Sequence, residues 1–268
     1  MAEEKRKIEG KRNKGMETGD MSETPLVSVI IPVYNGERFL AQAVESALMQ
    51  DVPAEILVLN DCSSDGTEQV MSRYRNCACV KYYVNEKNLG AAATRNRGVR
   101  LARGQYVAFL DADDWWEQGK LKKQLRKLSE TGMVLCCTGR ELMNEEGESL
   151  GKVIPVRERI TYQMLLRHNC INCSSVLMLR KAALEFPMEH EDSHEDYIAW
   201  LRLLKKYEQV CGINEPLLKY RLSGNGKSGG KLKSARMTFQ VYRYMGFGMV
   251  KSLMCFISYA LNGIWKYR

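Results

Sequence analysis

Four short apolar segments near the start of the chain alternate with helical patterns, and this alternation constrains the fold more than any other feature. Each segment is continuous and apolar enough to form a buried strand: residues 26–33, 55–60, 80–84 and 105–110. Helices are expected between them: residues 39–48, 67–75 and 90–102. Asn35 is a candidate N-cap of the first helix. Because parallel strands need such crossovers, the pattern predicts an α/β fold built on a parallel sheet.

The chain becomes less regular after Trp116. We expect helices at residues 120–129 and 198–207, strands at residues 133–138 and 173–179, and a polar loop at residues 144–151. These elements would complete the sheet and shape a pocket for a second substrate.

Three carboxylates follow the fourth apolar segment, at Asp111, Asp113 and Asp114, and Trp115 and Trp116 come next. Polar residues at the carboxyl ends of parallel strands line a crevice in which ligands bind. Crowded carboxylates repel one another unless a proton or cation joins them. Mg²⁺ and Mn²⁺ take oxygen ligands, often carboxylates together with substrate phosphates. The cluster therefore predicts a divalent cation that holds a phosphorylated substrate. The tryptophans can pack in the core or offer a face to a sugar, and core packing is the expectation for at least one.

The composition fits a globular chain with a sizeable core, since 45% of its 268 residues are hydrophobic and 27% are charged. A formal charge of +8 favours anionic partners. Nine cysteines without paired CxxC modules indicate buried thiols in a reducing cytosol; Cys170 and Cys173 are a lone pair. Residues 1–24 hold six basic and six acidic side chains with few apolar ones, so we expect disorder there. No uncharged apolar run reaches the ~20 residues that a membrane-spanning helix needs.

Five motifs occur in order along residues 27–222, each at an expected strand end or helix start. They are VSVIIPVYNGERFL from Val27, LNDCSSDGT from Leu59, NLG from Asn88 with ATRNRG from Ala93, DAD from Asp111, and HEDY from His194. Together they resemble family 2 glycosyltransferases, the bacterial inverting enzymes of the GT-A fold. Two departures are Asn60, where the family often has Asp, and Cys62, where it usually has Gly.

The resemblance implies a GT-A-like, Rossmann-related mixed sheet flanked by helices, followed by a C-terminal amphipathic helical tail. Residues 25–222 would be the catalytic domain, with a nucleotide-sugar-binding half at 25–116 and an acceptor half at 117–222. Residues 223–268 would be the basic tail.

The resemblance also assigns the donor site. Pro32, Tyr34 and Asn35 would frame the base and ribose, and Asp61 would accept a hydrogen bond from the base. Alternatives are a core aromatic for Tyr34 and a turn or cap carboxylate for Asp61. Glu37 would contact the nucleotide or favour the start of the next helix by its charge.

A second group of residues would bind the donor phosphates and the metal. Arg95 would neutralise the diphosphate, or else be a solvated helix charge. Asp111 would contact the ribose or a metal-bound water, and Asp113 would bind Mg²⁺ or Mn²⁺ directly. Asp114 would support the metal or cap the following segment.

Asp196 is the candidate general base, with Glu195 as second choice. Inverting transfer needs a carboxylate to take the proton of the acceptor hydroxyl. The alternative for both residues is a favourable charge at the start of a helix. The expected reaction moves a sugar from a nucleotide diphosphate sugar, with UDP favoured, to a lipid-linked surface glycan.

A competing motif is His190-Glu191-x-x-His194, which spells a zinc-hydrolase signature. The segment is acidic and poor in apolar residues, so a loop is favoured over the helix that zinc ligation needs. Tyr220 and Arg221 precede a Gly-rich stretch, residues 223–230, that in the family can close over the donor; the alternative is a flexible surface loop.

The tail mixes cations with Met, Phe, Tyr and Leu, which fits an interfacial helix on an anionic membrane. The favoured location is cytoplasmic, peripheral on the inner face of the cell membrane. Alternatives are a helix packed on the catalytic domain, a homodimer contact, and a basic membrane- or nucleic-acid-binding module without catalysis. No nucleic-acid motif accompanies the charge, so nucleic acid is not expected as a partner.

Overall fold

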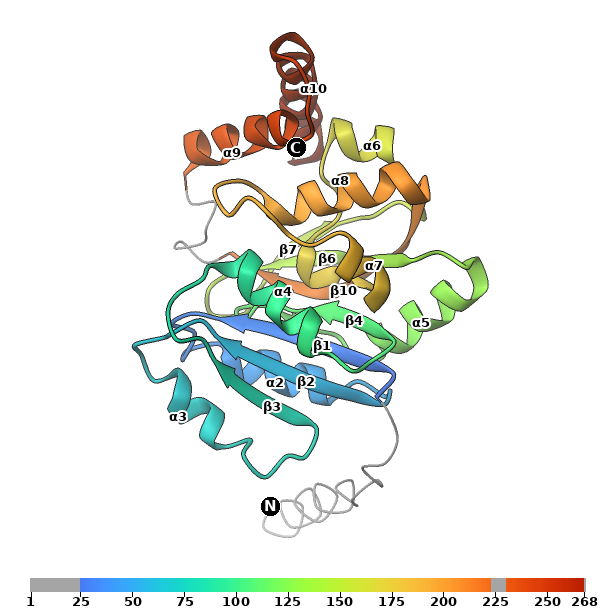
Figure 1. The fold of residues 1–268 in the computed structure, drawn as a ribbon. Helices are drawn as coiled ribbons and strands as arrows, with labels where there is room; N and C mark the ends of the chain where they lie inside the picture. Colours follow the sequence, from blue (N-terminus) through green and yellow to red (C-terminus); the bar gives the residue numbers. More distant parts are fainter. Residues whose placement is uncertain (1–24, 223–229, 268) are drawn as a thin grey trace.

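A mixed β-sheet runs through the computed structural model, which describes residues 25–222 and 230–267 (Figure 1). The expectation of disorder at residues 1–24 lies outside the described residues. The strand order is β3-β2-β1-β4-β9-β6-β10-β5, with β7 paired to β6 and β8 to β10. The α/β fold expected from the sequence, a mixed sheet flanked by helices, is confirmed.

The four apolar segments form four parallel strands, as predicted. They are β1 (Val27–Val33), β2 (Ala54–Asn60), β3 (Val80–Val84) and β4 (Tyr106–Phe109). Three helices connect them: α2 (Leu40–Leu48), α3 (Thr67–Ser72) and α4 (Ala91–Leu101). α4 packs closely on β1, because a Cβ atom at Gly98 would lie 2.5 Å from Cγ2 of Ile30.

Asn35 does not cap α2, so that prediction is wrong. The helix begins at Leu40, and Asn35 lies in a left-handed turn with φ of 51°. Its side-chain oxygen accepts a hydrogen bond from the backbone N of Ser64 instead, at 2.9 Å. The turn after β1 is therefore tied to the turn after β2.

The second half of the chain adds the antiparallel and peripheral parts of the sheet. Its strands are β5 (Trp115–Trp116), β6 (Leu135–Met143), β7 (Ser149–Ile154), β8 (Arg159–Thr161), β9 (Leu177–Leu179) and β10 (Gln209–Arg221). Its helices are α5 (Lys120–Thr131), α6 (Tyr162–Arg167), α7 (Arg180–Glu185) and α8 (Glu195–Tyr207), with a 3₁₀ turn, η1, at Cys173–Ser175. β9 pairs antiparallel with β4 and β6, while β6 and β10 are parallel.

Two of the sequence expectations for this half need correction. Residues 173–179 form a 3₁₀ turn and a short strand rather than one strand, because the Ser174 and Ser175 carbonyls accept from the side chains of Trp116 and Gln124. The polar loop expected to reach Gly151 ends earlier, since β7 begins at Ser149 and pairs with β6.

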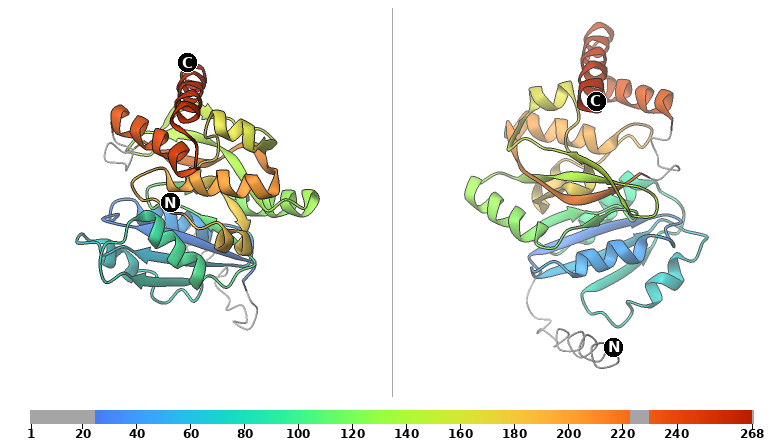
Figure 2. Two further views of the ribbon diagram at one scale, coloured as in Figure 1. Left: turned by 45° about the horizontal axis from the view of Figure 1, so that its top comes forward. Right: turned by 180° about the vertical axis from the view of Figure 1, so that it is seen from behind.

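Two helices follow the sheet domain, α9 (Lys231–Tyr244) and α10 (Met249–Tyr267). α9 packs on α8 through buried Met237, Val241 and Tyr242, and α10 packs on α6 and α9. Figures 1 and 2 show both helices at the end of the molecule opposite the β3 edge, with α10 projecting outward. Across residues 25–222 and 230–267, no helix combines the length and apolarity that crossing a membrane requires.

Candidate active site

A cleft of about 1400 Å³ lies where the carboxyl ends of the parallel strands face the start of α8. Nine of the ten residues predicted for the site line it: Pro32, Tyr34, Asn35, Asp61, Arg95, Asp111, Asp113, Glu195 and Asp196. The exception is Glu37, whose carboxylate accepts a hydrogen bond from the backbone N of Gly66 at 2.6 Å. The cleft exceeds the ~300–1,000 Å³ of a typical ligand pocket, so it has room for two substrates.

The wall formed by the turn after β1 combines an exposed ring with a fixed backbone. Tyr34 is 55% exposed, which excludes the alternative of a core aromatic. The backbone N of Asn35 donates to Oγ of Ser63 at 2.8 Å, so the turns after β1 and β2 support each other. Such a wall can hold a planar base against a ring.

Asp61 is buried and braces the turn before α4. Its Oδ1 accepts from Nδ2 of Asn85 at 2.6 Å and from the backbone N of Leu89 at 2.8 Å, and its Oδ2 accepts from the backbone N of Gly90 at 2.8 Å. The alternative of a turn carboxylate therefore describes part of what Asp61 does. An ionised carboxylate has about four acceptor sites, so Asp61 keeps capacity for a base N–H in the cleft.

Cys62 adopts a left-handed backbone conformation with φ of 64°. Gly reaches this region without steric cost, whereas a residue with a Cβ pays about 1–2 kcal/mol. The departure from Gly at this position therefore strains a turn beside the cleft.

Arg95 is buried between two carboxylates that come from opposite halves of the domain. Its Nη2 donates to Oδ1 of Asp111 at 2.5 Å, and its Nη1 donates to Oε1 of Glu195 at 3.0 Å. The alternative of a solvated helix charge is wrong. Since two carboxylates already share its charge, Arg95 ties the strand-end carboxylates to the start of α8.

Asp111 and Asp113 line the cleft, whereas Asp114 is buried behind them. Burial, followed by the charges of Asp113 and Asp111, raises the pKa of Asp114 well above its usual range. Its Oδ1 accepts from the backbone N of Arg221 at 3.0 Å, so Asp114 anchors the end of β10. This carboxylate repulsion is the kind that a divalent cation relieves.

Asp111 and Asp113 fit a cation that the substrate helps to hold. Within residues 25–222 and 230–267, no group of three or more His, Cys, Asp or Glu side chains could hold a metal ion on its own. Mg²⁺ and Mn²⁺ sites for phosphates commonly use one or two carboxylates, with the remaining ligands from substrate and water. The donor set of Asp111 and Asp113 matches that pattern.

Arg221 is a cleft residue whose placement the sequence did not predict. It ends β10, where Nε donates to the carbonyl of Asp113 at 2.9 Å. Its guanidinium lies 4.2 Å from the ring centroid of Phe39 and 4.7 Å from that of Trp115.

Trp116 is buried and donates to the carbonyl of Ser174 at 2.7 Å, which confirms core packing for one tryptophan. The Gly-rich residues 223–229 lie outside the described residues.

Asp196 stands in the first turn of α8 and lines the cleft beside Glu195. Burial, followed by the charge of Glu195, raises the pKa of Asp196 to about 7, while Arg95 acts in the opposite direction. Glu195 is engaged by Arg95. The pair therefore contains one carboxylate held in an ion pair and one whose pKa suits proton transfer near neutrality.

The zinc-hydrolase alternative lacks the geometry that it requires. His190 lies in a turn with φ of 68°, and its ring stacks on Tyr244 with centroids 3.7 Å apart. α8 begins only at Glu195, so His190 and His194 do not share a helical face. Glu191 instead accepts from the backbone N atoms of Ala91 and Ala92, at 3.0 and 2.8 Å, and caps α4.

Residues of the second half and of both tail helices also line the cleft. Ser234 of α9 and Tyr259 of α10 line it together with His168, Asn172 and His194. The Tyr259 ring lies 5.1 Å from the ring of His168 and 6.0 Å from that of Tyr197, between centroids. The tail is therefore part of the site, which no local sequence pattern indicates.

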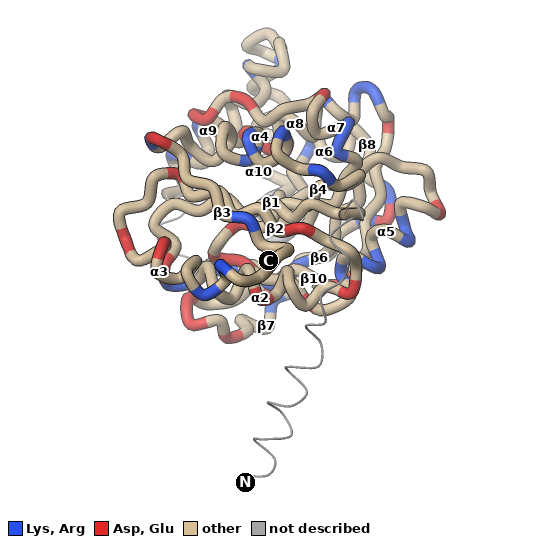
Figure 3. The backbone as a smooth tube through the Cα atoms, turned by 60° about the horizontal axis from the view of Figure 1, so that its bottom comes forward, with Lys and Arg blue, Asp and Glu red and all other residues tan. Residues whose placement is uncertain are grey.

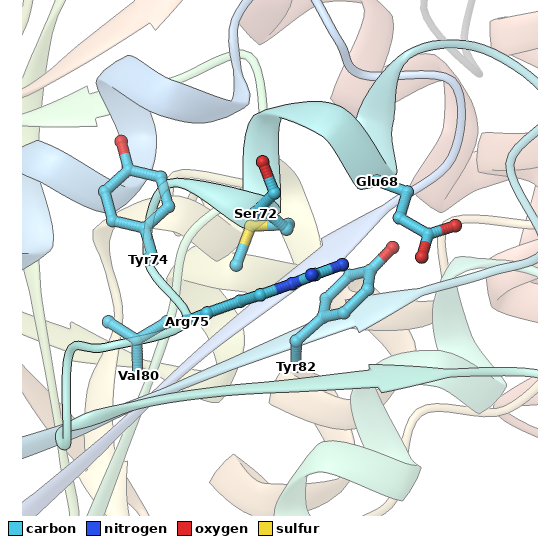
Figure 4. Close-up of a pocket in the computed structure, with 7 residues that line it drawn as sticks. Glu68, Ser72, Tyr74, Arg75, Val80 and Tyr82 are labelled. Carbon is cyan, nitrogen blue, oxygen red and sulfur yellow. The ribbon is translucent and has the colours of Figure 1, made fainter.

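A second cavity, of about 240 Å³, lies between α3 and β3 (Figure 4). Its wall includes Tyr82, whose hydroxyl accepts from Nδ2 of Asn60 at 2.6 Å. The two cavities share no lining residue.

Comparison with known proteins places this geometry in a family. The family model described as Glycosyl transferase family 2 matches residues 28–186. The chain is 38% identical over 245 residues to the putative teichuronic acid biosynthesis glycosyltransferase TuaG of Bacillus subtilis, covering 90% of this chain and 97% of that protein. It is 31% identical to the UDP-Glc:alpha-D-GlcNAc-diphosphoundecaprenol beta-1,3-glucosyltransferase WfgD of Escherichia coli, covering 90% and 95%.

Solved structures share the fold. Staphylococcus aureus TarS 1-349 in complex with UDP-GlcNAc superposes with a TM-score of 0.67 at 18% identity, covering 86% of this chain and 70% of that one. The mannosyltransferase PcManGT from Pyrobaculum calidifontis, in complex with GDP-Man and Mn²⁺, superposes with a TM-score of 0.65 at 16% identity, covering 90% and 71%.

Proposed function

This chain belongs to glycosyltransferase family 2, and from its cleft we propose that it transfers a sugar from a nucleotide diphosphate sugar to a glycan acceptor with inversion. The observation that carries the proposal is the placement of Asp111, Asp113 and Asp196 in one cleft. The first two suit the phosphate side of a donor, and the third suits the acceptor hydroxyl.

UDP is the proposed nucleotide. WfgD is named for a UDP-glucose donor, and TarS has been solved with UDP-GlcNAc. Pro32, Tyr34 and Asn35 would frame the base and ribose, and Asp61 would accept from the base. Glu37 would act indirectly, because it holds the loop after β2.

Asp113, with Asp111 beside it, would hold Mg²⁺ or Mn²⁺ against the donor phosphates. The bound cation would supply Lewis-acid neutralisation of the charge on the departing nucleoside diphosphate. Arg95 would act at the same end by keeping Asp111 in place, since Asp111 and Glu195 already share its charge. PcManGT, which shares the fold, has been solved with Mn²⁺.

Asp196 would act as the general base. It takes the proton of the acceptor hydroxyl as that oxygen forms a bond to the anomeric carbon. The bond from that carbon to the phosphate oxygen breaks on the opposite face, and its electron pair leaves with the nucleoside diphosphate. Such positioned proton transfer contributes about 10²–10⁴-fold to the rate.

The proposed acceptor is a lipid-linked glycan of a surface polysaccharide. TuaG is named for teichuronic acid biosynthesis, and WfgD for a diphosphoundecaprenol-linked acceptor. The part of the cleft lined by His168, Asn172 and His194 would receive the acceptor sugar. A lipid-linked acceptor lies in a bilayer, so the enzyme would work peripherally on the inner face of the cell membrane.

Incubation of the purified enzyme with a panel of UDP-, GDP- and TDP-sugars and a short-chain lipid diphosphate glycan tests the proposal. We expect one UDP-sugar to be consumed in the presence of Mg²⁺ or Mn²⁺, and NMR of the product to show an inverted anomeric carbon. Retention of configuration, or no transfer from any donor, would overturn it.

A further inference from the structure

α10 has two apolar faces, and only one of them packs on the protein. Its inner face, which packs on α6 and α9, consists of Ser252, Cys255, Phe256 and Tyr259. The other apolar face, the outer stripe, consists of six residues that are each 50% to 75% exposed: Met249, Val250, Leu253, Met254, Ile257 and Leu261. Their spacing of one, three and four residues places them along one side of a helix.

The outer stripe needs a covering partner. Single exposed hydrophobic residues are normal on a protein surface, but a continuous row marks an interaction site. α10 also projects from the rest of the molecule in Figures 1 and 2, so the stripe is accessible from outside.

The charge of the chain shows what kind of partner this is. Residues 223–268 contain eight of the 40 Lys and Arg residues and none of the 32 Asp and Glu residues. Residues 1–222 therefore hold 32 of each sign and are formally neutral, and the whole charge of +8 belongs to the tail. In Figure 3 the two signs are interspersed over the sheet domain.

Two tail cations lie at Phe247, just before the start of α10. Arg243 donates to the carbonyl of Phe247 at 2.6 Å, and Nζ of Lys251 lies 4.1 Å from the centroid of the Phe247 ring. Both are exposed, as are Lys233 and Arg236 on α9. An apolar stripe bordered by cations suits an anionic bilayer. A second copy of this chain would bring two tails of equal positive charge together, which electrostatic repulsion disfavours.

The same helix connects this surface to the cleft. Tyr259, on the inner face of α10, lines the acceptor end of the cleft together with Ser234 of α9. When the outer stripe lies in the headgroup region, the acceptor end of the cleft is held next to the bilayer. A lipid-linked sugar then reaches Asp196 while its hydrocarbon tail stays in the membrane.

We propose that the outer stripe of α10 docks on an anionic bilayer and thereby presents the acceptor end of the cleft to lipid-linked glycans. The docking part stands on α10 and its charges alone. The part concerning the acceptor rests on the proposed function.

Co-sedimentation of the full-length protein with vesicles tests the docking. The variant L253E/I257E places two carboxylates in the stripe, at residues that are each 50% exposed. A matched control is L150E/V153E on β7, where both side chains are also 50% exposed. Vesicles of phosphatidylcholine, with and without phosphatidylglycerol, separate the apolar contribution from the electrostatic one.

The wild type and L150E/V153E should bind phosphatidylglycerol vesicles with equal affinity. L253E/I257E should bind them at least about a hundredfold more weakly. Removing one exposed cation, as in Arg236→Gln, should weaken binding about fivefold to anionic vesicles only. Equal binding by the stripe variant and the control would overturn the proposal. So would light scattering that shows a wild-type dimer which L253E/I257E converts to a monomer, because a second copy would then cover the stripe.

Transfer assays separate the docking from the proposed function. L253E/I257E should keep transfer to a short-chain, water-soluble acceptor and lose at least tenfold in transfer to a long-chain acceptor in vesicles. Equal loss with both acceptors would contradict the presentation of the acceptor by α10. If the wild type transfers to neither acceptor, the proposed function fails, and sedimentation still decides whether α10 docks.

Discussion

Nη1 of Arg95 donates to Oε1 of Glu195 at 3.0 Å across a separation of one hundred residues. This contact holds Glu195 in an ion pair and so distinguishes it from its neighbour Asp196. Glu195 balances the charge of a buried guanidinium. Asp196 lines the same cleft with a pKa raised by burial. We therefore propose a structural role for Glu195 and a chemical role for Asp196.

The first prediction concerns Asp196→Asn. The variant should lose about 10²–10⁴-fold in kcat, because the amide cannot take the acceptor proton, while donor affinity changes little. Steady-state transfer and calorimetric titration with UDP measure the two quantities. Glu195→Gln is the comparison: it should impair folding stability more than Asp196→Asn does, since it leaves Arg95 short of a partner. Full turnover by Asp196→Asn would remove Asp196 from its assigned role.

The second prediction is a pH profile. The base must be ionised to act, so log(kcat/KM) should rise with pH and level off above about 7, the pKa to which burial raises Asp196. Arg95 lowers that pKa, so Arg95→Gln should move the rising limb to higher pH, whereas Arg95→Lys keeps the charge and should leave the limb near its wild-type position. Initial rates between pH 5 and about 9 provide the measurement. A limb that stays in place in Arg95→Gln would contradict the electrostatic link.

Most of residues 25–116 could be predicted because strand ends are local features. An apolar run that stops at Asn60 or Leu110 gives both the strand and the edge of the sheet on which the next polar residue lies. The partners of Arg95 could not be read in this way. They are sixteen and one hundred residues distant, and tertiary packing brings Asp111, after β4, and Glu195, at the start of α8, to the same guanidinium on α4.

The part of the cleft that the second half of the chain lines was less predictable for a similar reason. Tyr259 belongs to a helical apolar pattern, but no sequence pattern predicts that α10 packs back on the domain and lines the cleft. Glu191 belonged to a misleading zinc motif, and its actual partners are backbone N–H groups, which carry no sequence signal. Tertiary contacts with backbone atoms are the part of a site that a single sequence conceals.

The third prediction concerns Glu191→Ala. Both carboxylate oxygens of Glu191 cap the first turn of α4, so their loss should cost about 1 kcal/mol and lower Tm by about 2–4 °C. Thermal unfolding followed by circular dichroism measures this change. Glu189→Ala, in the same loop, removes only an exposed ion pair with Arg202 and should have a smaller effect. Equal decreases in Tm for the two variants would show that the capping hydrogen bonds of Glu191 stabilise the fold no more than an exposed ion pair does.

The fourth prediction concerns the cation. Asp113→Ala should abolish the gain in UDP affinity that Mn²⁺ gives the wild type, because it removes the proposed direct ligand from the cleft. Asp51→Ala, at an exposed position outside the residues that line the cleft, should retain that gain. Titration of UDP with and without Mn²⁺ distinguishes the variants. A metal-dependent affinity that survives in Asp113→Ala would exclude Asp113 as the ligand.

The fifth prediction follows from Lys120, a fully buried lysine whose Nζ donates to Oε1 of Gln124 at 2.8 Å and lies 4.1 Å from the centroid of the Trp116 ring. Burial lowers the pKa of Lys120 from 10.5 to about 7. The unfolded chain therefore binds one more proton than the folded chain between those two values, and stability should rise with pH through that window by at most about 1.4 kcal/mol per unit.

Lys120→Met removes the buried charge and should flatten the rise, so the variant gains most over the wild type near pH 7. The loss of the bond to Gln124 offsets part of this gain. Lys122→Met, an exposed position in the same helix, should preserve the wild-type slope. Urea unfolding at several pH values gives each slope. An unchanged slope in Lys120→Met would mean that Lys120 stays protonated in the core, held by Gln124 and the face of Trp116.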